Sequence, residues 1–269
     1  MMLTTLQRSR LSNQILGWQG GSGPQLLLIH GVGMHADYWS NLIPTLMNHF
    51  SLTVIDMPGH GQSPTLAEEV PTLFSYTDCI NQLIHDNTDP ILVAGHSMGA
   101  MIAIDLASRY PKSVSAIVAL NAVYQRSVEA MTAVRTRAES IVEASTLDSC
   151  QTLERWFGHE PEGVNAQASA ACAQWLSEVN HTGYRQAYRA FAFHDGPDKT
   201  SLQQLRCPAL FMTGEDEPNS TPAMSSAMAS IAKQGDCHII KGARHMMSMT
   251  HGTEVLERLL SFLLSQDSR

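Results

Sequence analysis

One serine stands between two glycines at a spacing that suits a catalytic nucleophile. Ser97 lies in Gly95-His-Ser-Met-Gly99, directly after the apolar run 91–94 and before the Ala/Ile/Leu-rich segment 98–110. In a strained strand-to-helix turn, a serine presents its hydroxyl above the sheet and at a helix N-terminus, and flanking glycines prevent clashes within the turn. The pattern therefore predicts that Ser97 attacks a carbonyl carbon.

The elements that would position such a serine are short apolar runs alternating with amphipathic segments. Buried strands are predicted at 25–30, 52–56, 91–94, 114–120, 209–213 and 237–240, and helices at 73–87, 98–110, 222–231 and 253–264. Strands that alternate with helices are typical of βαβ units and a parallel sheet. The predicted fold class is therefore α/β, with a mostly parallel central sheet flanked by helices.

The alternation stops between residues 122 and 200, where strand signals vanish and helical patterns cover 126–144 and 164–192. We interpret 122–200 as a helical cap insert in a core made of 1–121 and 201–269. Open α/β sheets bind ligands at the carboxyl edge of their strands. We therefore expect the insert to cover that edge and to form part of a binding pocket.

Composition excludes several classes of protein. The 17 Lys+Arg against 25 Asp+Glu give a net charge of −8, and the chain has no basic run of the kind that binds nucleic acid or an acidic membrane surface. No apolar run approaches the ~20 residues of a membrane span, and residues 1–17 lack the apolar core of a signal peptide. The scattered cysteines form no Cys-x-x-Cys pair, so we expect free thiols and a cytoplasmic protein.

The chain resembles the α/β-hydrolases over essentially its full length. The residues that carry the resemblance are the serine motif, His30-Gly-Val-Gly33 after the first buried strand, and Asp56-Met-Pro-Gly-His-Gly-Gln-Ser63 after the second. The resemblance implies an α/β-hydrolase fold and an oxyanion hole made of the backbone N–H groups of Val32 and Met98. His30 and Asp56 are interpreted as residues that order their loops.

In this family the residues of the triad follow the chain order serine, acid, histidine. The resemblance assigns the base to His245, after the last predicted strand, in preference to His251. It places the acid three residues after Gly214, at Glu217, and Asp216 remains the alternative one residue earlier. Successive side chains point in different directions, so only one of the two carboxylates can face His245.

Several side chains near the predicted site are candidates for substrate contact. Trp39 follows the oxyanion loop and Met246 follows the histidine. In the insert, Tyr184 and Tyr188 share one helix face through their i, i+4 spacing, as do Arg185 and Arg189, and an arginine of this kind would bind a carboxylate. The insert also offers the aromatic side chains Trp156, Trp175 and Phe191.

The expected function is hydrolysis of a small-molecule carboxylic ester or lactone through an acyl-enzyme on Ser97. One alternative is carbon–carbon bond hydrolysis of ring-cleavage products, which Trp39-Ser-Asn41 favours and Met246 disfavours, because that subgroup carries Trp after its histidine. Hydrolysis of a small amide is a further alternative, and a non-enzymatic binding protein of the same fold is disfavoured by the intact motifs. We expect no cofactor and no metal, since metal-ligand spacing such as His-Glu-x-x-His is missing. The expected partner is a small-molecule substrate, and the oligomeric state is left open.

Overall fold

A mostly parallel sheet organises the computed structural model, which describes residues 5–141 and 149–266. In these residues, eight strands form one sheet in the order β1-β2-β4-β3-β5-β6-β7-β8. The strands are β1 (Ser9–Arg10), β2 (Leu16–Gly21), β3 (Gln25–Ile29), β4 (Ser51–Asp56), β5 (Ile91–His96), β6 (Val114–Leu120), β7 (Ala209–Gly214) and β8 (Gly235–Ile240). β2 pairs antiparallel with β1 and β4, and the pairs from β4 to β8 are parallel. The predicted fold class is confirmed.

Helices cover both faces of this sheet. Apart from four helices described below, they are the 3₁₀ helix η1 (Ala36–Trp39) and the α-helices α1 (Ile43–Leu46), α2 (Leu73–Ile84), α3 (Met98–Arg109), α8 (Lys199–Gln204), which begins at the end of the predicted insert, α9 (Pro222–Ile231), α10 (Met247–Thr250) and α11 (Gly252–Leu264). Side chains alternate along a strand, so β3 sends Leu27 and Ile29 into one core, with α2, α3 and α9. Leu26 and Leu28 enter the other core, with η1 and α11.

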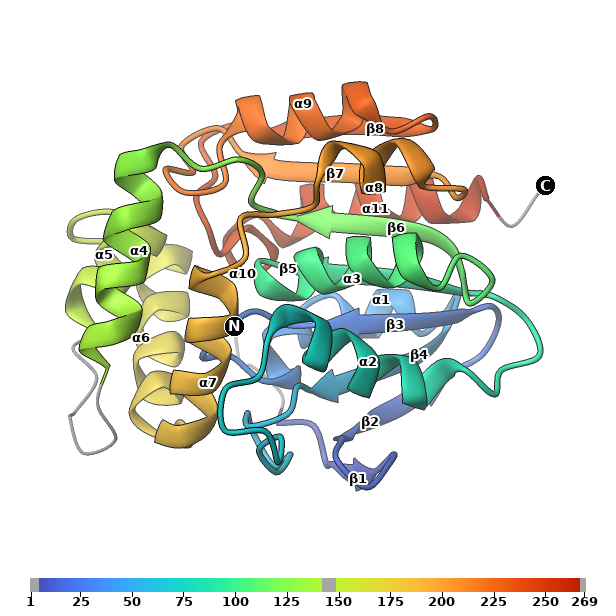
Figure 1. Ribbon diagram of the computed structural model, residues 1–269, viewed down its shortest axis with the longest axis horizontal. Helices are drawn as coiled ribbons and strands as arrows, with labels where there is room; N and C mark the ends of the chain where they lie inside the picture. The colour runs from blue at the N-terminus through green and yellow to red at the C-terminus, as the bar shows by residue number, and fades with distance from the viewer. Residues whose placement is uncertain (1–4, 142–148, 267–269) are drawn as a thin grey trace.

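The predicted insert contains four further helices and, in its described residues, no strand. They are α4 (Val128–Ser140), α5 (Cys150–Phe157), α6 (Gly163–Ser177) and α7 (His181–Ala192). They form a separate layer beyond the end of β6, at the left of Figure 1. The segment predicted as helical at 164–192, with a break at Gly183, is two helices that separate between Ser177 and His181. Residues 142–144 of the other predicted helical segment lie outside the described residues. We refer to α4–α7 as the cap; the sequence limits of the insert and the core stay predictions.

Contacts in two places help to hold the cap on the core. The chain segments that enter and leave the cap are joined to each other. Gln125 N–H donates to the Asp195 carbonyl at 3.0 Å, and the buried Arg126 guanidinium pairs with the Asp195 carboxylate at 3.3 Å. At the other end of the cap, Gly183 lies backbone to backbone against Gly59, and a Cβ on Gly183 would fall 2.0 Å from the Gly59 oxygen. The cap therefore seats directly on the turn that follows β4.

Candidate active site

Ser97 occupies a strained turn between β5 and α3. Its φ of 55° and ψ of −117° are rare for a residue with a side chain and cost about 1–3 kcal/mol. The turn is possible because its flanks are glycines: a Cβ on Gly95 would lie 2.1 Å from the Gly99 oxygen, and a Cβ on Gly99 would lie 2.3 Å from the Ile29 oxygen. The local sequence thus directs the Ser97 hydroxyl outward at the start of a helix.

The Glu217 carboxylate is hydrogen-bonded to His245, the histidine that the sequence predicts as the base. His245 Nδ1 lies 2.8 Å from Glu217 Oε2, and both side chains are buried. The other Glu217 oxygen accepts hydrogen bonds from the backbone N–H groups of Asn219 at 2.7 Å and Ser220 at 3.2 Å. Asp216 is exposed, and its backbone N–H donates to the Ala243 carbonyl. The structure therefore brings Glu217, and not Asp216, to His245.

The Glu217 carboxylate is a negatively charged hydrogen-bond acceptor for His245. Burial by itself would raise the pKa of Glu217, but the His245 ring and the two backbone N–H donors outweigh it and hold that pKa below its usual 4.5. Glu217 is thus a carboxylate at neutral pH, and it accepts the proton on His245 Nδ1. The remaining ring nitrogen, Nε2, is left with a lone pair that can take up a proton.

Aromatic rings enclose His245. The Trp156 indole from α5 stacks on it at 5.7 Å between centroids and 19° between planes. The His96 ring, at the end of β5, has its centroid 4.8 Å from that of His245. The sequence analysis named Trp156 among the aromatic side chains of the insert but did not place it against His245, because helix α5 was not predicted.

One cavity of about 370 Å³ contains both Ser97 and His245. A cavity of this size accommodates a small molecule. Its walls come from α4, α5 and α7 of the cap and from the loop before α9. The lining residues are Val32, Ser97, Val123, Arg126, Ser127, Ala130, Ala133, Val134, Arg137, Thr152, Arg155, Trp156, Tyr184, Tyr188, Phe191, Pro218, Asn219, Ser220, Thr221, Met224 and His245.

Arginines of the cap and of the segment just before it give this cavity a positive wall. Arg126 is paired with Asp195 and lies over the Phe191 ring at 4.5 Å. Arg137 donates to the neutral Thr152 hydroxyl at 2.6 Å and lies over the Tyr188 ring at 5.4 Å. Arg155 is exposed and lines the cavity from α5. Arg137 and Arg155 are thus the cations best placed to meet an anionic ligand.

Of the four residues on α7 that were predicted as substrate contacts, two line the cavity. Tyr184 and Tyr188 line the cavity, whereas Arg185 and Arg189 are not among its lining residues. Arg189 instead lies over the Phe193 ring at 4.6 Å. Successive residues of a helix are rotated by about 100° about its axis. Arg185 and Arg189, each one position after a tyrosine, therefore lie on a different side of α7 from the tyrosines that line the cavity.

Trp39 and Met246, which were also predicted as substrate contacts, are not among the residues that line the cavity. Trp39 is fully buried in the core on the η1 side of the sheet, with its ring 4.9 Å from that of Tyr38. Met246 is 1% exposed and packs in the same core. Both lie near the site in sequence, but their side chains fill the layer beneath it.

The two residues expected to form the oxyanion hole both lie near Ser97, since Val32 lines the same cavity and Met98 follows Ser97 in the chain. Val32 lines the cavity, and Met98 is the first residue of α3, where a backbone N–H has no acceptor one turn earlier in the helix. The loop of Val32 is tied down by His30, whose Nδ1 lies 2.7 Å from the Gly31 carbonyl. His30 Nε2 accepts from Met57 N–H at 2.9 Å. Burial keeps this ring neutral, with a pKa well below its ordinary value.

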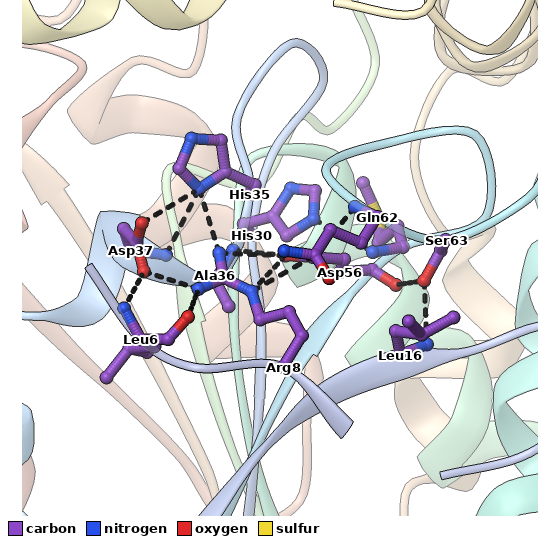
Figure 2. A network of polar contacts seen from close by, with 11 residues as sticks. Leu6, Arg8, Leu16, His30, His35, Ala36, Asp37, Asp56, Gln62 and Ser63 are labelled. Carbon is purple, nitrogen blue, oxygen red and sulfur yellow. Dashed lines mark hydrogen bonds and ion pairs between the residues drawn. The ribbon is translucent and has the colours of Figure 1, made fainter. Parts of the chain in front are cut away.

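A buried charge network supports the same loop from behind, as Figure 2 shows. Arg8 contacts Asp37 at 2.7 Å and Asp56 at 3.1 Å. Asp56 in turn accepts from the backbone N–H groups of Ala36 at 2.8 Å and Gln62 at 2.9 Å. Asp56 therefore fixes both the loop after β3 and the turn after β4, in agreement with its interpretation as a structural residue.

No group of three or more His, Cys, Asp or Glu side chains in the described residues is arranged to hold a metal ion. Nor does that part of the chain contain a helix with the length and apolar character of a membrane span.

The comparisons with known proteins agree with the fold. The chain is 39% identical to the (E)-2-((N-methylformamido)methylene)succinate hydrolase of Acinetobacter baylyi, over 91% of this chain and 92% of that protein. It is 27% identical to the pimeloyl-[acyl-carrier protein] methyl ester esterase of Methylococcus capsulatus, over 91% and 96%.

Among solved structures, a thermophilic esterase from Thermogutta terrifontis aligns with a TM-score of 0.83 at 22% identity, covering 94% of this chain and 93% of the other. The family model of the alpha/beta hydrolase fold matches residues 24–252. The chain therefore belongs to the α/β-hydrolase fold family and is a hydrolase of that fold.

Proposed function

We propose that this protein is a serine hydrolase that cleaves an acyl bond in a small anionic substrate, with Ser97 as nucleophile, His245 as base and Glu217 as the orienting acid. One observation carries the proposal: the strained Ser97 and the Glu217-bound His245 line a single cavity that also contains cap arginines. A structural serine needs neither the strained turn nor a charge-paired histidine in its cavity.

The first half of the reaction forms an acyl-enzyme. His245 Nε2 takes the proton of the Ser97 hydroxyl as Oγ bonds to the substrate carbonyl carbon, and the carbonyl electron pair moves to its oxygen. The N–H groups of Val32 and Met98 would stabilise this oxyanion, which is worth several kcal/mol per donor. When the carbon–nitrogen or carbon–oxygen bond breaks, the leaving atom receives the proton from His245.

The second half regenerates the enzyme. Water gives a proton to His245 and attacks the acyl carbon, the bond to Ser97 Oγ breaks, and Oγ regains the proton. Glu217 remains a carboxylate throughout and stabilises the imidazolium form of His245 that appears in both halves.

The substrate class follows from the positive wall of the cavity. Guanidinium groups pair with carboxylates through strong charge-assisted hydrogen bonds, and Arg137 and Arg155 reach the cavity from two different cap helices. The name of the 39%-identical relative describes an N-formylated unsaturated dicarboxylate. We therefore favour the amide bond of an N-acylated dicarboxylic acid as the bond that is cleaved.

A carboxylic ester or lactone of a similar acid is the second candidate. A relative at 27% identity is a methyl ester esterase, and the same triad chemistry serves esters and amides. The two candidates differ in the leaving atom, which is nitrogen in one and oxygen in the other.

The test measures product release from two acids with the purified protein. (E)-2-((N-methylformamido)methylene)succinate reports amide cleavage through formate, and monomethyl succinate reports ester cleavage through methanol. We expect Ser97→Ala to reduce turnover of the better substrate by at least about 10³-fold, because it removes the nucleophile. Wild-type turnover in Ser97→Ala would refute the proposal, and faster methanol release would favour the ester.

A further inference from the structure

His96 is a buried histidine for which the proposed reaction has no use. It is the last residue of β5, next to Ser97, and it is 1% exposed. Its Nε2 lies 2.9 Å from the backbone carbonyl oxygen of His245, 149 positions further along the chain. A side chain beside the proposed nucleophile is thus bonded to the main chain of the proposed base.

The hydrogen bond defines the state of this ring. A carbonyl oxygen can only accept, so Nε2 carries the proton and donates it. Burial keeps the ring neutral, with a pKa well below its ordinary value, and Nδ1 therefore carries no proton. Among the described residues, Nδ1 has no hydrogen-bond partner. The ring is held in addition by stacking on Tyr38, at 4.5 Å and 23°.

The loop of His245 is held at two of its carbonyl groups. On one side, Asp216 N–H donates to the Ala243 carbonyl at 2.9 Å, which ties the loop to the segment that carries Glu217. On the other side, the His96 bond ties it to the Ser97 turn. The first contact aligns acid with base, and the second spans the gap between base and nucleophile.

We propose that His96 is a positioning residue that sets the distance and angle between Ser97 and the His245 ring. The inference rests on the proposed roles of those two residues. Catalysis by a positioned base is sensitive to such placement, since a displacement of about 1 Å can reduce the rate by about 10²-fold. Loss of the bond would leave the His245 carbonyl buried without this donor and free the loop to shift.

The experiment compares two substitutions of similar length and volume. His96→Gln retains an N–H donor, whereas His96→Met fills the space without one. With p-nitrophenyl acetate as the probe, we expect His96→Met to lose about tenfold in kcat with little change in KM, as befits one lost hydrogen bond. His96→Gln should recover most of that loss. The rate at which a fluorophosphonate labels Ser97 should follow the same order.

Thermal unfolding of both variants shows whether each is folded at the assay temperature. Equal losses in His96→Gln and His96→Met, or wild-type kcat in a folded His96→Met, would overturn the positioning role and leave the proposed function intact. If the His96→Met variant does not fold, a kcat for His96→Gln at least about tenfold below wild type would also overturn it. Full activity in Ser97→Ala would instead refute the proposed function and the inference together.

Discussion

Glu217 and Asp216 are neighbours in the chain, yet only one of them contacts His245. Under the proposed mechanism the carboxylate of Glu217 stabilises the imidazolium, so Glu217→Gln should lower kcat by about 10³- to 10⁴-fold. Asp216→Asn changes an exposed side chain and should alter kcat by less than about threefold. Steady-state kinetics of both variants with p-nitrophenyl acetate decide the matter, and a larger loss in Asp216→Asn would reverse the assignment.

The cap arginines make a second prediction about single residues. Arg137→Gln and Arg155→Gln should each raise KM for a dicarboxylate substrate by about 10- to 100-fold, because each removes a charge-assisted hydrogen bond. KM for the neutral p-nitrophenyl acetate should barely change. Arg185→Gln provides the matched control on α7, whose arginines are not among those that line the cavity. An equal rise in KM for both substrates would argue against recognition of the carboxylate.

The residues differ in how far the sequence could identify them. Ser97 stands in a local motif whose glycines create the turn themselves, so its position could be read from five consecutive residues. Arg137 and Arg155 carry no such pattern. Which side of a cap helix faces the cavity depends on how that helix packs on the others, and this information is not local.

At the scale of elements, the seating of the cap depends on the contact between Gly183 and Gly59. In Gly183→Ala the new methyl would meet backbone atoms on Gly59, which cannot move aside as a side chain can. We expect a loss of about 1–3 kcal/mol in the free energy of unfolding and a raised KM, because α7 lines the cavity.

Urea denaturation measures the change in stability. Gly252→Ala is a matched control, since its Cβ would meet only Leu42 at an ordinary 3.6 Å, and its cost should stay below about 0.5 kcal/mol. Equal stability of wild type and Gly183→Ala would show that α7 is free to move away from the turn after β4.

Strands that consist of buried apolar residues were predicted most accurately, whereas elements whose pairing or ends depend on distant parts of the chain were predicted least accurately. The six predicted strands correspond to β3–β8, and the apolar residues of β3, β5, β6 and β7 are buried on both faces of the sheet. β2 was missed because its six residues include three glycines, which weaken a strand signal, and its antiparallel pairing with β4 depends on a distant partner. The break between α6 and α7 falls at Asn180, whose side chain caps α7.

At the scale of the whole molecule, buried neutral histidines make stability depend on pH. Burial lowers the pKa of His60 to about 4 from 6.5, so the unfolded chain binds this proton at a higher pH than the folded chain does. Protonation therefore favours unfolding. The free energy of unfolding should fall by about 3 kcal/mol through His60 as the pH drops from 6.5 to 4.

The measurement is urea unfolding at a series of pH values for wild type and His60→Gln. The variant should show a smaller decrease between pH 6.5 and 4, whatever its stability at neutral pH. Parallel curves would mean that His60 does not contribute to the pH dependence.

The Arg8 network also bears on where the functional unit begins. The family match starts at residue 24, whereas the cation that neutralises Asp37 and Asp56 comes from residue 8. A truncation designed on the family match would leave the buried Asp37 and Asp56 carboxylates without this cation, next to the loop that carries Val32. A fusion or a shortened variant of this hydrolase should therefore retain the segment with Arg8, which lies outside the family match and yet supplies a buried counter-charge to residues within it.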